Sequence, residues 1–279
     1  MIKPNTLGIY QFIRNAKYYD YPFFESIMSA LPIADEIVIA ECYSDKDNTF
    51  EELEKLAEQY PKIRIVRHPW VDHFSNLCVP GNFAALHLQT EWTMQLQADE
   101  VLHEDCYDEF NKIKYNSVMD TTAYLVHYTH MLANYETEFD FCYKQLIRVG
   151  RKGTGWKLIG DACQLDGGDF KAIRDSKIHI FHYGKIHSGD IGFKKEIDFQ
   201  NLYKDIGFPD PKMKIMQEKL GKDFCDYVFL FEQDIKDGKV RKFSGAHPLI
   251  MKNRIEKFKQ EGYEQFVSAI KSDLSLRSI

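Results

Sequence analysis

The chain has 279 residues, of which 44% are hydrophobic and 28% charged, and its formal net charge is −6. This length accommodates one large α/β domain with an appendage. The acidic balance argues against a surface built to grip nucleic acid, although Arg148, Arg151 and Lys152 allow a local basic patch.

The six cysteines lie at positions 42, 78, 106, 142, 163 and 225, and no two form a C-x-x-C pair. This spacing argues against a zinc ribbon and against a redox dithiol, so we expect buried thiols in a reducing compartment. Residues 1–10 lack a basic segment followed by a long apolar run, and no apolar stretch approaches the roughly 20 residues that span a bilayer. We therefore predict a cytoplasmic enzyme without a signal peptide.

The first hundred residues alternate between short apolar runs and helical patterns. Pro22 fits the first turn of a helix, Thr49-x-x-Glu52 predicts a capping box, and Pro61 ends the helix that this box opens. We predict strands at residues 7–13, 36–40, 62–66 and 92–96, and helices at residues 21–30, 49–60 and 82–89. Such alternation is typical of a parallel sheet covered by helices.

The second half of the chain has a different pattern. Residues 122–128 and 143–149 predict longer strands that pair antiparallel, residues 150–168 a glycine-rich loop, and residues 178–181 a short strand. From about residue 192 the pattern is mostly helical and ends in an amphipathic helix near residues 249–270. We therefore predict a catalytic domain at residues 1–190 and a helical extension at residues 191–279.

The most informative segment is Leu96-Gln97-Ala98-Asp99-Glu100, in which an apolar strand runs into two adjacent carboxylates. Ligands of open parallel sheets bind beyond the carboxyl ends of the strands. Carboxylates at that place suit a hard divalent cation such as Mn²⁺ or Mg²⁺, which bridges to substrate phosphates and neutralises a departing diphosphate. The alternative is a surface turn that carries two solvated acids.

Several segments in order resemble one known family. Residues 12–15 (FIRN), 25–27 (ESI), 35–39 (DEIVI) and 44–49 (SDKDNT) resemble the opening of the family-2 glycosyltransferases, and QADE at residues 97–100 resembles their DADE metal motif. Residues 156–162 and 179–184 also resemble a branch of this family. The resemblance covers residues 7 to about 200.

The resemblance implies a GT-A fold, which is a Rossmann-like, mainly parallel mixed sheet flanked by helices. It also implies transfer of a sugar from a nucleoside-diphosphate donor to an acceptor hydroxyl, with inversion at the anomeric carbon. The residues that it assigns to donor binding are Arg14, Asn15, Glu41, Gln97, Ala98 and Asp99. It assigns a divalent cation to Asp99, with Glu100 assisting and His182 as a further metal or diphosphate ligand, although a lone histidine at a strand end can instead be packed and hydrogen-bonded.

Three positions depart from the family pattern. Gln97 replaces the first Asp of the D-x-D motif, and an amide binds a ribose hydroxyl but is a poor metal ligand. Gly81-Asn82 stands where the family carries Arg-Asn, and the turn at residues 44–49 is one residue longer.

Asp161 is the candidate general base, because an inverting transferase needs a carboxylate to take the proton of the acceptor hydroxyl. It lies in the glycine-rich loop at the place where relatives carry a catalytic acid, and the alternative is a turn-forming Asp. Asp166 and Asp169 are weaker candidates. We expect Lys194 and Lys195 on a solvated helix face, and Trp70 and Trp156 either in a sugar or base pocket or in the core.

Two rival functions remain open at this stage. One is a catalytically inactive GT-A domain that binds a nucleotide sugar or a glycan, which Gln97 and Gly81 motivate. The other is nucleotidyl transfer on the same fold, which would release pyrophosphate. A nucleic-acid base as acceptor is possible and is not favoured, because the net charge is acidic.

Overall fold

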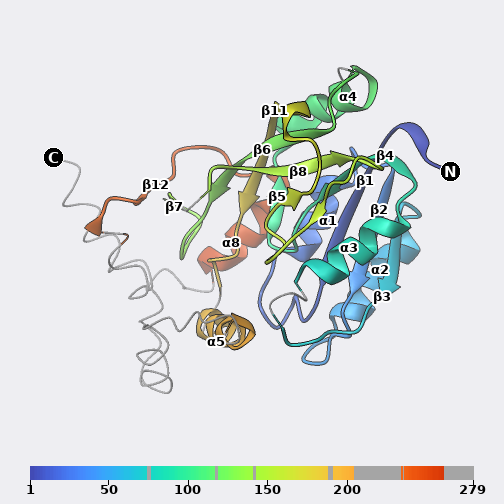
Figure 1. Cartoon of the computed structure of the whole chain (residues 1–279). Coiled ribbons are helices and arrows are strands. Elements are labelled where there is room, and N and C mark those ends of the chain that lie inside the picture. Colours follow the sequence, from blue (N-terminus) through green and yellow to red (C-terminus); the bar gives the residue numbers. More distant parts are fainter. Residues whose placement is uncertain are drawn as a thin grey trace.

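The computed structural model describes residues 1–73, 77–116, 119–140, 143–187, 191–203, 234 and 236–260 (Figure 1). Within these residues no helix has the length and hydrophobicity needed to cross a membrane. The helices (α), 3-10 helices (η) and strands (β) are β1 (Lys3–Ile13), α1 (Phe23–Ala30), β2 (Glu36–Glu41), α2 (Thr49–Gln59), β3 (Ile63–Arg67), α3 (Cys78–His87), β4 (Thr90–Gln95), β5 (Glu100–Leu102), η2 (Glu104–Cys106), α4 (Tyr107–Asn116), β6 (Ala123–His130), β7 (Thr137–Phe139), β8 (Gln145–Arg151), β9 (Lys157–Leu158), β10 (Leu165–Asp166), η3 (Phe170–Ala172), β11 (Ile173–His182), α5 (Ile191–Tyr203), β12 (Val240–Lys242), η6 (Leu249–Met251) and α8 (Lys252–Gln260).

One large mixed sheet organises the molecule, with strand order β3-β2-β1-β4-β8-β6-β11-β5. Strands β3, β2, β1 and β4 are parallel, which confirms the sheet that the alternating pattern predicts. β8 runs antiparallel to both β4 and β6, so the predicted antiparallel pairing of residues 122–128 with residues 143–149 is also confirmed. The α/β, GT-A-like fold class predicted from the sequence is thus the one observed.

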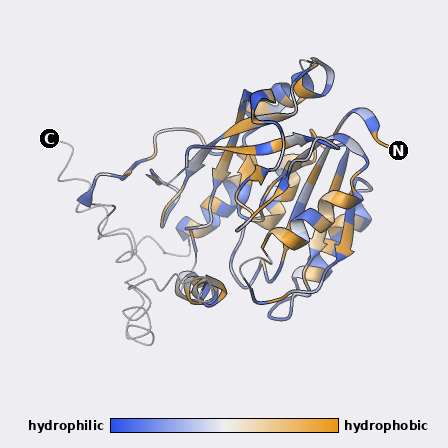
Figure 2. Cartoon of the chain, viewed as in Figure 1, coloured by the Kyte–Doolittle hydropathy of each residue, from blue (hydrophilic) through white to orange (hydrophobic). Residues whose placement is uncertain are grey.

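The alternation of side chains along β1 divides the core into two layers. Leu7, Ile9 and Ile13 face a cluster that includes residues of α1, α2 and α4, whereas Tyr10 faces the opposite cluster with residues of α3. Figure 2 shows the hydrophobic colouring concentrated on the central strands and the inner sides of the helices. Full burial of each such aliphatic side chain stabilises the fold by about 1.5–3 kcal/mol. Because β1 is covered on both faces, apolar residues are favoured at nearly every position of its buried part.

Two local predictions differ from the structure. The capping box at Thr49 does not form, because Asn48 occupies the N-cap and makes no side-chain capping bond. The Thr49 hydroxyl instead accepts the backbone N–H of Lys17. The strand predicted at residues 178–181 is longer, since β11 pairs with β6 from Ile173 to His182.

The described parts of the region after residue 190 pack on the sheet. Met251 and Phe258, from η6 and α8, lie in one hydrophobic cluster with Val101 and Phe181 of the sheet. β12 pairs with β7, so this region contains a strand as well as helices α5 and α8. Residues 204–233 and 261–279, on which much of the predicted helical extension falls, lie outside the described residues.

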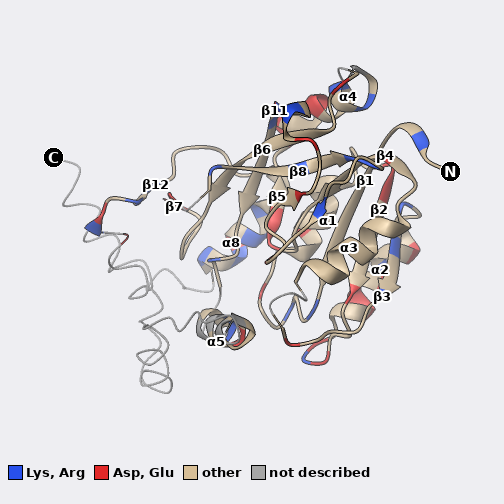
Figure 3. Cartoon of the chain, in the orientation of Figure 1, with Lys and Arg blue, Asp and Glu red and all other residues tan. Residues whose placement is uncertain are grey.

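Charged residues of both signs are interspersed over the helices and loops, while most of the central strands carry few of them (Figure 3). Over the coloured residues, neither sign of charge is gathered on one element. Arg148, a member of the suggested basic patch, is fully buried and therefore contributes nothing to a surface patch.

Candidate functional site

A cleft of about 960 Å³ lies beyond the carboxyl ends of β1 and β4. Its lining includes Arg14 after β1, Asp99 after β4, His182 at the end of β11 and Lys195 on α5. The carboxyl edge of a parallel sheet is where ligands bind in open α/β folds, and this volume suits a ligand larger than a monosaccharide.

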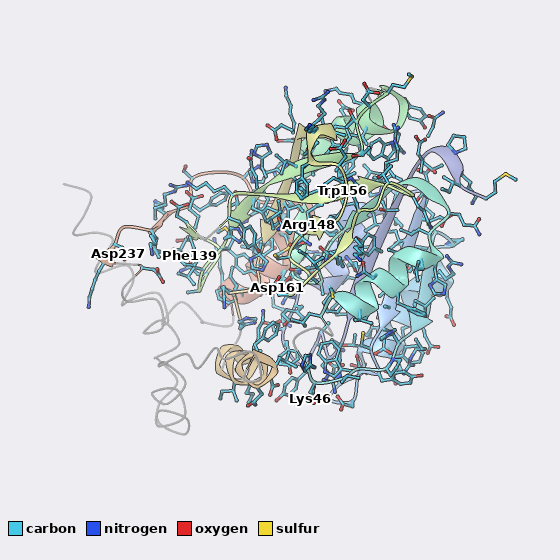
Figure 4. The ribbon with its side chains drawn as sticks, viewed as in Figure 1. Lys46, Phe139, Arg148, Trp156, Asp161 and Asp237 are labelled. Atoms are coloured by element: carbon cyan, nitrogen blue, oxygen red, sulfur yellow. The ribbon has the colours of Figure 1, made fainter. Side chains whose placement is uncertain are left out.

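Helix α5 forms one wall of the cleft and is held to the sheet by side-chain contacts. Lys46, from the loop between β2 and α2, pairs with Asp198 of α5 at 2.9 Å. The Tyr19 hydroxyl donates to the same carboxylate. Figure 4 shows Lys46 beside α5, and residues of this helix line the cleft together with Lys46.

Asp99 and His182 meet because β5 turns back along β11. Glu100 lies opposite His182 in this antiparallel pair, and the Tyr183 N–H donates to the Asp99 carbonyl at 2.8 Å. The His182 Nε2 atom consequently lies 3.6 Å from the Asp99 Oδ2 atom. The structure thus brings together two residues, 83 positions apart by number (182 − 99), that the resemblance assigns to one cation.

Lys195 joins this pair, which corrects the expectation of a solvated lysine. Its side chain is buried, with Nζ 3.5 Å from Asp99 Oδ2 and 2.7 Å from the Gly184 carbonyl oxygen. The ammonium also lies 4.5 Å from the centre of the Tyr21 ring. Burial alone would raise the pKa of Asp99, but His182 and Lys195 outweigh it and hold that pKa well below its ordinary value.

Gly184 leaves the space that this cluster needs. A Cβ atom at Gly184 would lie 2.4 Å from Asp99 Oδ2 and 2.5 Å from His182 Nε2. Neighbouring ligands of an octahedral ion at about 2.1 Å lie roughly 3.0 Å apart. The two atoms are 3.6 Å apart, so a small closing movement of the side chains would let them share one ion. Among the described residues no set of three or more His, Cys, Asp and Glu side chains is gathered for a metal. The pair therefore fits an ion such as Mg²⁺ or Mn²⁺, which takes its other ligands from substrate phosphates and water.

Glu100 has a different environment from Asp99. Its side chain is fully buried and pairs with the buried guanidinium of Arg148, while the Tyr128 hydroxyl donates to the same oxygen at 3.1 Å. Its second oxygen accepts the Gln97 N–H at 2.8 Å. Because both oxygens are engaged beneath the cleft, this geometry argues against the predicted role of Glu100 at the metal.

Gln97 ties the end of β4 to the loop that carries Asp161. Its side-chain amide donates to the Ala162 carbonyl at 3.2 Å, and Arg148 donates to the same oxygen at 3.3 Å. Asp161 lines the cleft and accepts the Cys163 N–H at 3.2 Å. The hydrogen bond of Gln97 thus joins the metal motif to the loop of the candidate base. Figure 4 shows Arg148 and Asp161 in the middle of the molecule.

Arg14 and Trp70 form the opposite end of the cleft. Arg14 donates two hydrogen bonds of 3.1 Å to Asp45, and its guanidinium carbon lies 5.3 Å from the centre of the Trp70 ring. The Nε atom of Arg14 is buried and has no hydrogen-bond partner among the described residues. Ala98 also lines the cleft and is almost buried. An aromatic face beside a guanidinium charge suits a nucleobase and a phosphate oxygen.

Asn15 and Glu41 were also predicted to contact the donor. In the structure they instead stabilise the loop beside the cleft. The buried Asn15 donates to Asp45 at 2.9 Å and accepts the backbone N–H groups of Asp45 and Lys46. Glu41 is fully buried and accepts the Ser44 N–H at 2.7 Å. Neither side chain lines the cleft, so both shape the loop that follows β2.

Three other candidates lie outside the cleft. Asp166 accepts the N–H of the next residue, and Asp169 caps a 3-10 helix, as turn-forming acids do. Trp156 packs against Phe170 and donates to a threonine hydroxyl, and Figure 4 shows it well away from Asp161. Of the two tryptophans expected either in a sugar or base pocket or in the core, Trp70 lines the cleft and Trp156 does not.

His130, which was not among the residues predicted for the site, lies behind His182. The two Nδ1 atoms are 3.0 Å apart, and His130 Nε2 lies 3.0 Å from the Tyr143 carbonyl oxygen. Burial, together with His182, lowers the pKa of His130 to about 3. The sequence signal for its inward position is that His130 has the same strand parity as the apolar residues Val126 and Tyr128, and the burial pattern of β6 shows all three on the buried face.

No protein-family model matches the sequence, and no curated protein matches it. Among solved structures, residues 1–349 of S. aureus TarS match over 82% of this chain and 73% of that chain, with 12% identity and a TM-score of 0.42. The same fragment in complex with UDP-GlcNAc matches over 83% and 81%, with 11% identity and a TM-score of 0.42. This chain spans 44% of a longer TarS chain, with a TM-score of 0.43. Similarity at this level says nothing about function. The function of this chain has to be inferred from the geometry of the cleft.

Proposed function

We propose that this protein is a glycosyltransferase that moves a sugar from a nucleoside-diphosphate donor to an acceptor hydroxyl, with a divalent cation at Asp99 and His182. The observation that carries the proposal is the convergence of Asp99 Oδ2 and His182 Nε2, 3.6 Å apart, in a cleft at the carboxyl edge of the sheet. When bound there, the cation would neutralise the negative charge of the diphosphate.

The cleft has a distinct chemistry for each part of such a donor. Trp70 offers an aromatic face to the base, and the positive charge of Arg14 lies beside it. Lys195 and Lys185 line the region around Asp99, where they would hold the diphosphate by charge. Asp161 lines the same cleft, on the loop fixed by Gln97.

In the proposed reaction Asp161 takes the proton of the acceptor hydroxyl. The hydroxyl oxygen attacks the anomeric carbon, and the bond from that carbon to the diphosphate breaks on the opposite side, which inverts the configuration. The Cys163 N–H donates to one oxygen of Asp161 and the Cys163 thiol hydrogen-bonds the same carboxylate, and these contacts orient it in the cleft for the proton. Lys195 would stay beside the leaving diphosphate as its charge grows.

A second candidate function is a binding domain without transferase activity. The observation that favours it is the engagement of Gln97 with the Ala162 carbonyl and of Glu100 with Arg148, which leaves Asp99 as the single carboxylate at the cation. Such a domain would bind nucleotide sugars, and its Asp161→Asn variant would behave as the wild type in every assay.

The proposal is tested by incubating the protein with a panel of nucleoside-diphosphate sugars and Mn²⁺ or Mg²⁺ and measuring release of the nucleoside diphosphate. We expect release with one donor, its loss in Asp99→Asn, and a large reduction in Asp161→Asn while the donor still raises the melting temperature. Asp166→Asn, at a turn outside the cleft, is the matched control. Donor binding without release supports the binding domain, and pyrophosphate release from a nucleoside triphosphate supports nucleotidyl transfer.

A further inference from the structure

Asp161 lies between two residues whose backbones are left-handed. Gly160 has a φ of +53° and Ala162 a φ of +61°. Glycine adopts such angles freely, whereas the Cβ atom of an alanine crowds the neighbouring backbone, so an alanine at positive φ has to be held there by other contacts. Ala162 is also fully buried, with its methyl group in a hydrophobic cluster. The surroundings of Ala162 therefore supply the contacts that keep its backbone in this conformation.

Two side chains donate hydrogen bonds to the Ala162 carbonyl. The Gln97 amide donates to this oxygen at 3.2 Å, and the Arg148 Nη1 group donates to it at 3.3 Å. Arg148 is 0% exposed, so a carbonyl that turned away would leave this buried donor without the partner that it has here. The cost of losing these bonds opposes the return of Ala162 to a negative φ.

Arg148 is itself fixed by bonds to other elements. Its Nη2 atom pairs with Glu100, and its Nε atom donates to the Tyr128 hydroxyl on β6. The second oxygen of Glu100 accepts the backbone N–H of Gln97 at 2.8 Å. One guanidinium thus connects the segment that follows β4 with the carbonyl of Ala162.

The backbone of Ala162 determines where the next N–H group points. The Ala162 N–H donates to the Ile159 carbonyl at 2.9 Å, and the Cys163 N–H donates to Asp161 Oδ1 at 3.2 Å. Because the φ angle of Ala162 lies between these two N–H groups, rotation to a negative φ would carry the Cys163 N–H away from the carboxylate. Asp161 would then lose one of the contacts that orient it in the cleft.

We propose that Ala162 is a positioning residue: Arg148 and Gln97 hold it in the left-handed conformation, and this conformation orients the Asp161 carboxylate toward the acceptor. The role of Asp161 belongs to the proposed function, on which this part of the inference rests. The conformation of Ala162 and the bonds that hold it are properties of the protein alone. Displacement of a reacting group by about 1 Å can cost about 100-fold in rate, so loss of this conformation should appear in kcat.

The conformation of Ala162 can be read by NMR in protein labelled with ¹³C,¹⁵N-alanine, without metal or donor. At a positive φ the amide and α hydrogens of one residue lie close together, which gives a strong nuclear Overhauser effect between them. The Ala162 signals are assigned by their loss in Ala162→Gly. We expect a strong effect in the wild type, and a weak effect there would overturn the inference.

Two variants each remove one of the donors to the Ala162 carbonyl. Gln97→Met keeps the size of the side chain but loses the amide, and Arg148→Lys keeps the positive charge beside Glu100 but loses the fork of donors. For variants whose circular dichroism and melting curves show a folded protein, we expect a weaker Overhauser effect at Ala162 in each. An unchanged effect in both contradicts the inference.

Ala162→Gly separates the held backbone from a general loss of packing, because glycine adopts a positive φ without help. At saturating donor and acceptor, Gln97→Met should lower kcat by about 10–100-fold beside Ala162 but only a few-fold in the double variant with Ala162→Gly. Ala133→Gly is the matched control, because Ala133 is also a buried alanine, has a φ of +62° and lies outside the cleft. Combined with it, Gln97→Met should keep its full effect. An equal effect of Gln97→Met in all three backgrounds contradicts the inference.

The two proposals fail in different measurements. A protein in which the Gln97 amide holds Ala162 left-handed, but which releases no nucleoside diphosphate from any donor, would defeat the proposed function and leave the bonds that hold Ala162 standing. Donor turnover in Gln97→Met at the wild-type kcat would defeat the inference and leave the proposed function standing.

Discussion

Replacing Glu100 by glutamine separates the two roles that an acid at this position can have. In the structure its carboxylate neutralises the guanidinium of Arg148, and both side chains are 0% exposed. Glu100→Gln keeps the size of the side chain but leaves the buried charge of Arg148 without its partner. Removing one partner of a buried pair costs about 3–5 kcal/mol of unfolding free energy. At about 2–4 °C for each kcal/mol in a chain of this size, the melting temperature should fall by about 6–20 °C.

The loss can be assigned to the pair by a double-mutant cycle followed by urea unfolding. Arg148→Met removes the charge, and the double variant with Glu100→Gln should lose less than the two single variants together, by about 1–3 kcal/mol. Glu52→Gln is the matched control, because Glu52 pairs with lysines at the surface, where such contacts contribute about 0–1 kcal/mol. The reasoning is refuted if Glu100→Gln melts like the wild type and loses Mn²⁺ affinity as completely as Asp99→Asn.

Three further predictions concern the cleft and its support. Gly184→Ala places a methyl group against both atoms proposed to hold the cation and should weaken Mn²⁺ binding by about tenfold or more. Gly153→Ala is the control: a Cβ atom there meets no atom within 4 Å, but the φ of +87° strains an alanine, so the variant should lose about 1–2 kcal/mol of stability and keep its Mn²⁺ affinity. Trp70→Ala should weaken binding of the donor nucleotide by about 1–3 kcal/mol in calorimetry, with much of the loss restored by Phe, and equal wild-type affinity in both would exclude stacking. The pKa of His187 is held well below its ordinary value by burial and by a neighbouring lysine, so the unfolded chain binds a proton that the folded protein does not. Stability from this group is therefore complete above pH 6.5 and falls by up to about 1.4 kcal/mol per pH unit below it, and His187→Gln should reduce that slope in urea titrations between pH 5 and 7.

The strand pattern alone predicted the parallel half of the sheet. EIVIA at residues 36–40 and the apolar run of β1 are buried on both faces, and such runs between helical segments have few other stable arrangements. The antiparallel pair β6 and β8 was also predicted, because both runs are longer and follow one another closely. The ends of elements were less certain, as at Thr49, where a tertiary contact replaced the local cap.

The position of Asp99 at a ligand edge likewise followed from the sequence, because a buried strand that ends in acids delivers them to the carboxyl edge of its sheet. The sequence placed both Asp99 and its neighbour Glu100 at the cation, because it does not show in which direction each side chain points. That direction is set by Arg148, a residue 48 positions away that is buried beneath the cleft.

The remaining members of the site depended on tertiary structure. The sequence pattern indicates a surface lysine at position 195, and only the packing of α5 brings Lys195 to Asp99. Gly184 and His130 come close to His182 only because β5, β6 and β11 lie side by side. Periodicity reports which face of an element is buried, because it reflects local geometry. Which two atoms from distant segments lie within 4 Å depends on how those segments pack, and that information is spread over the whole chain.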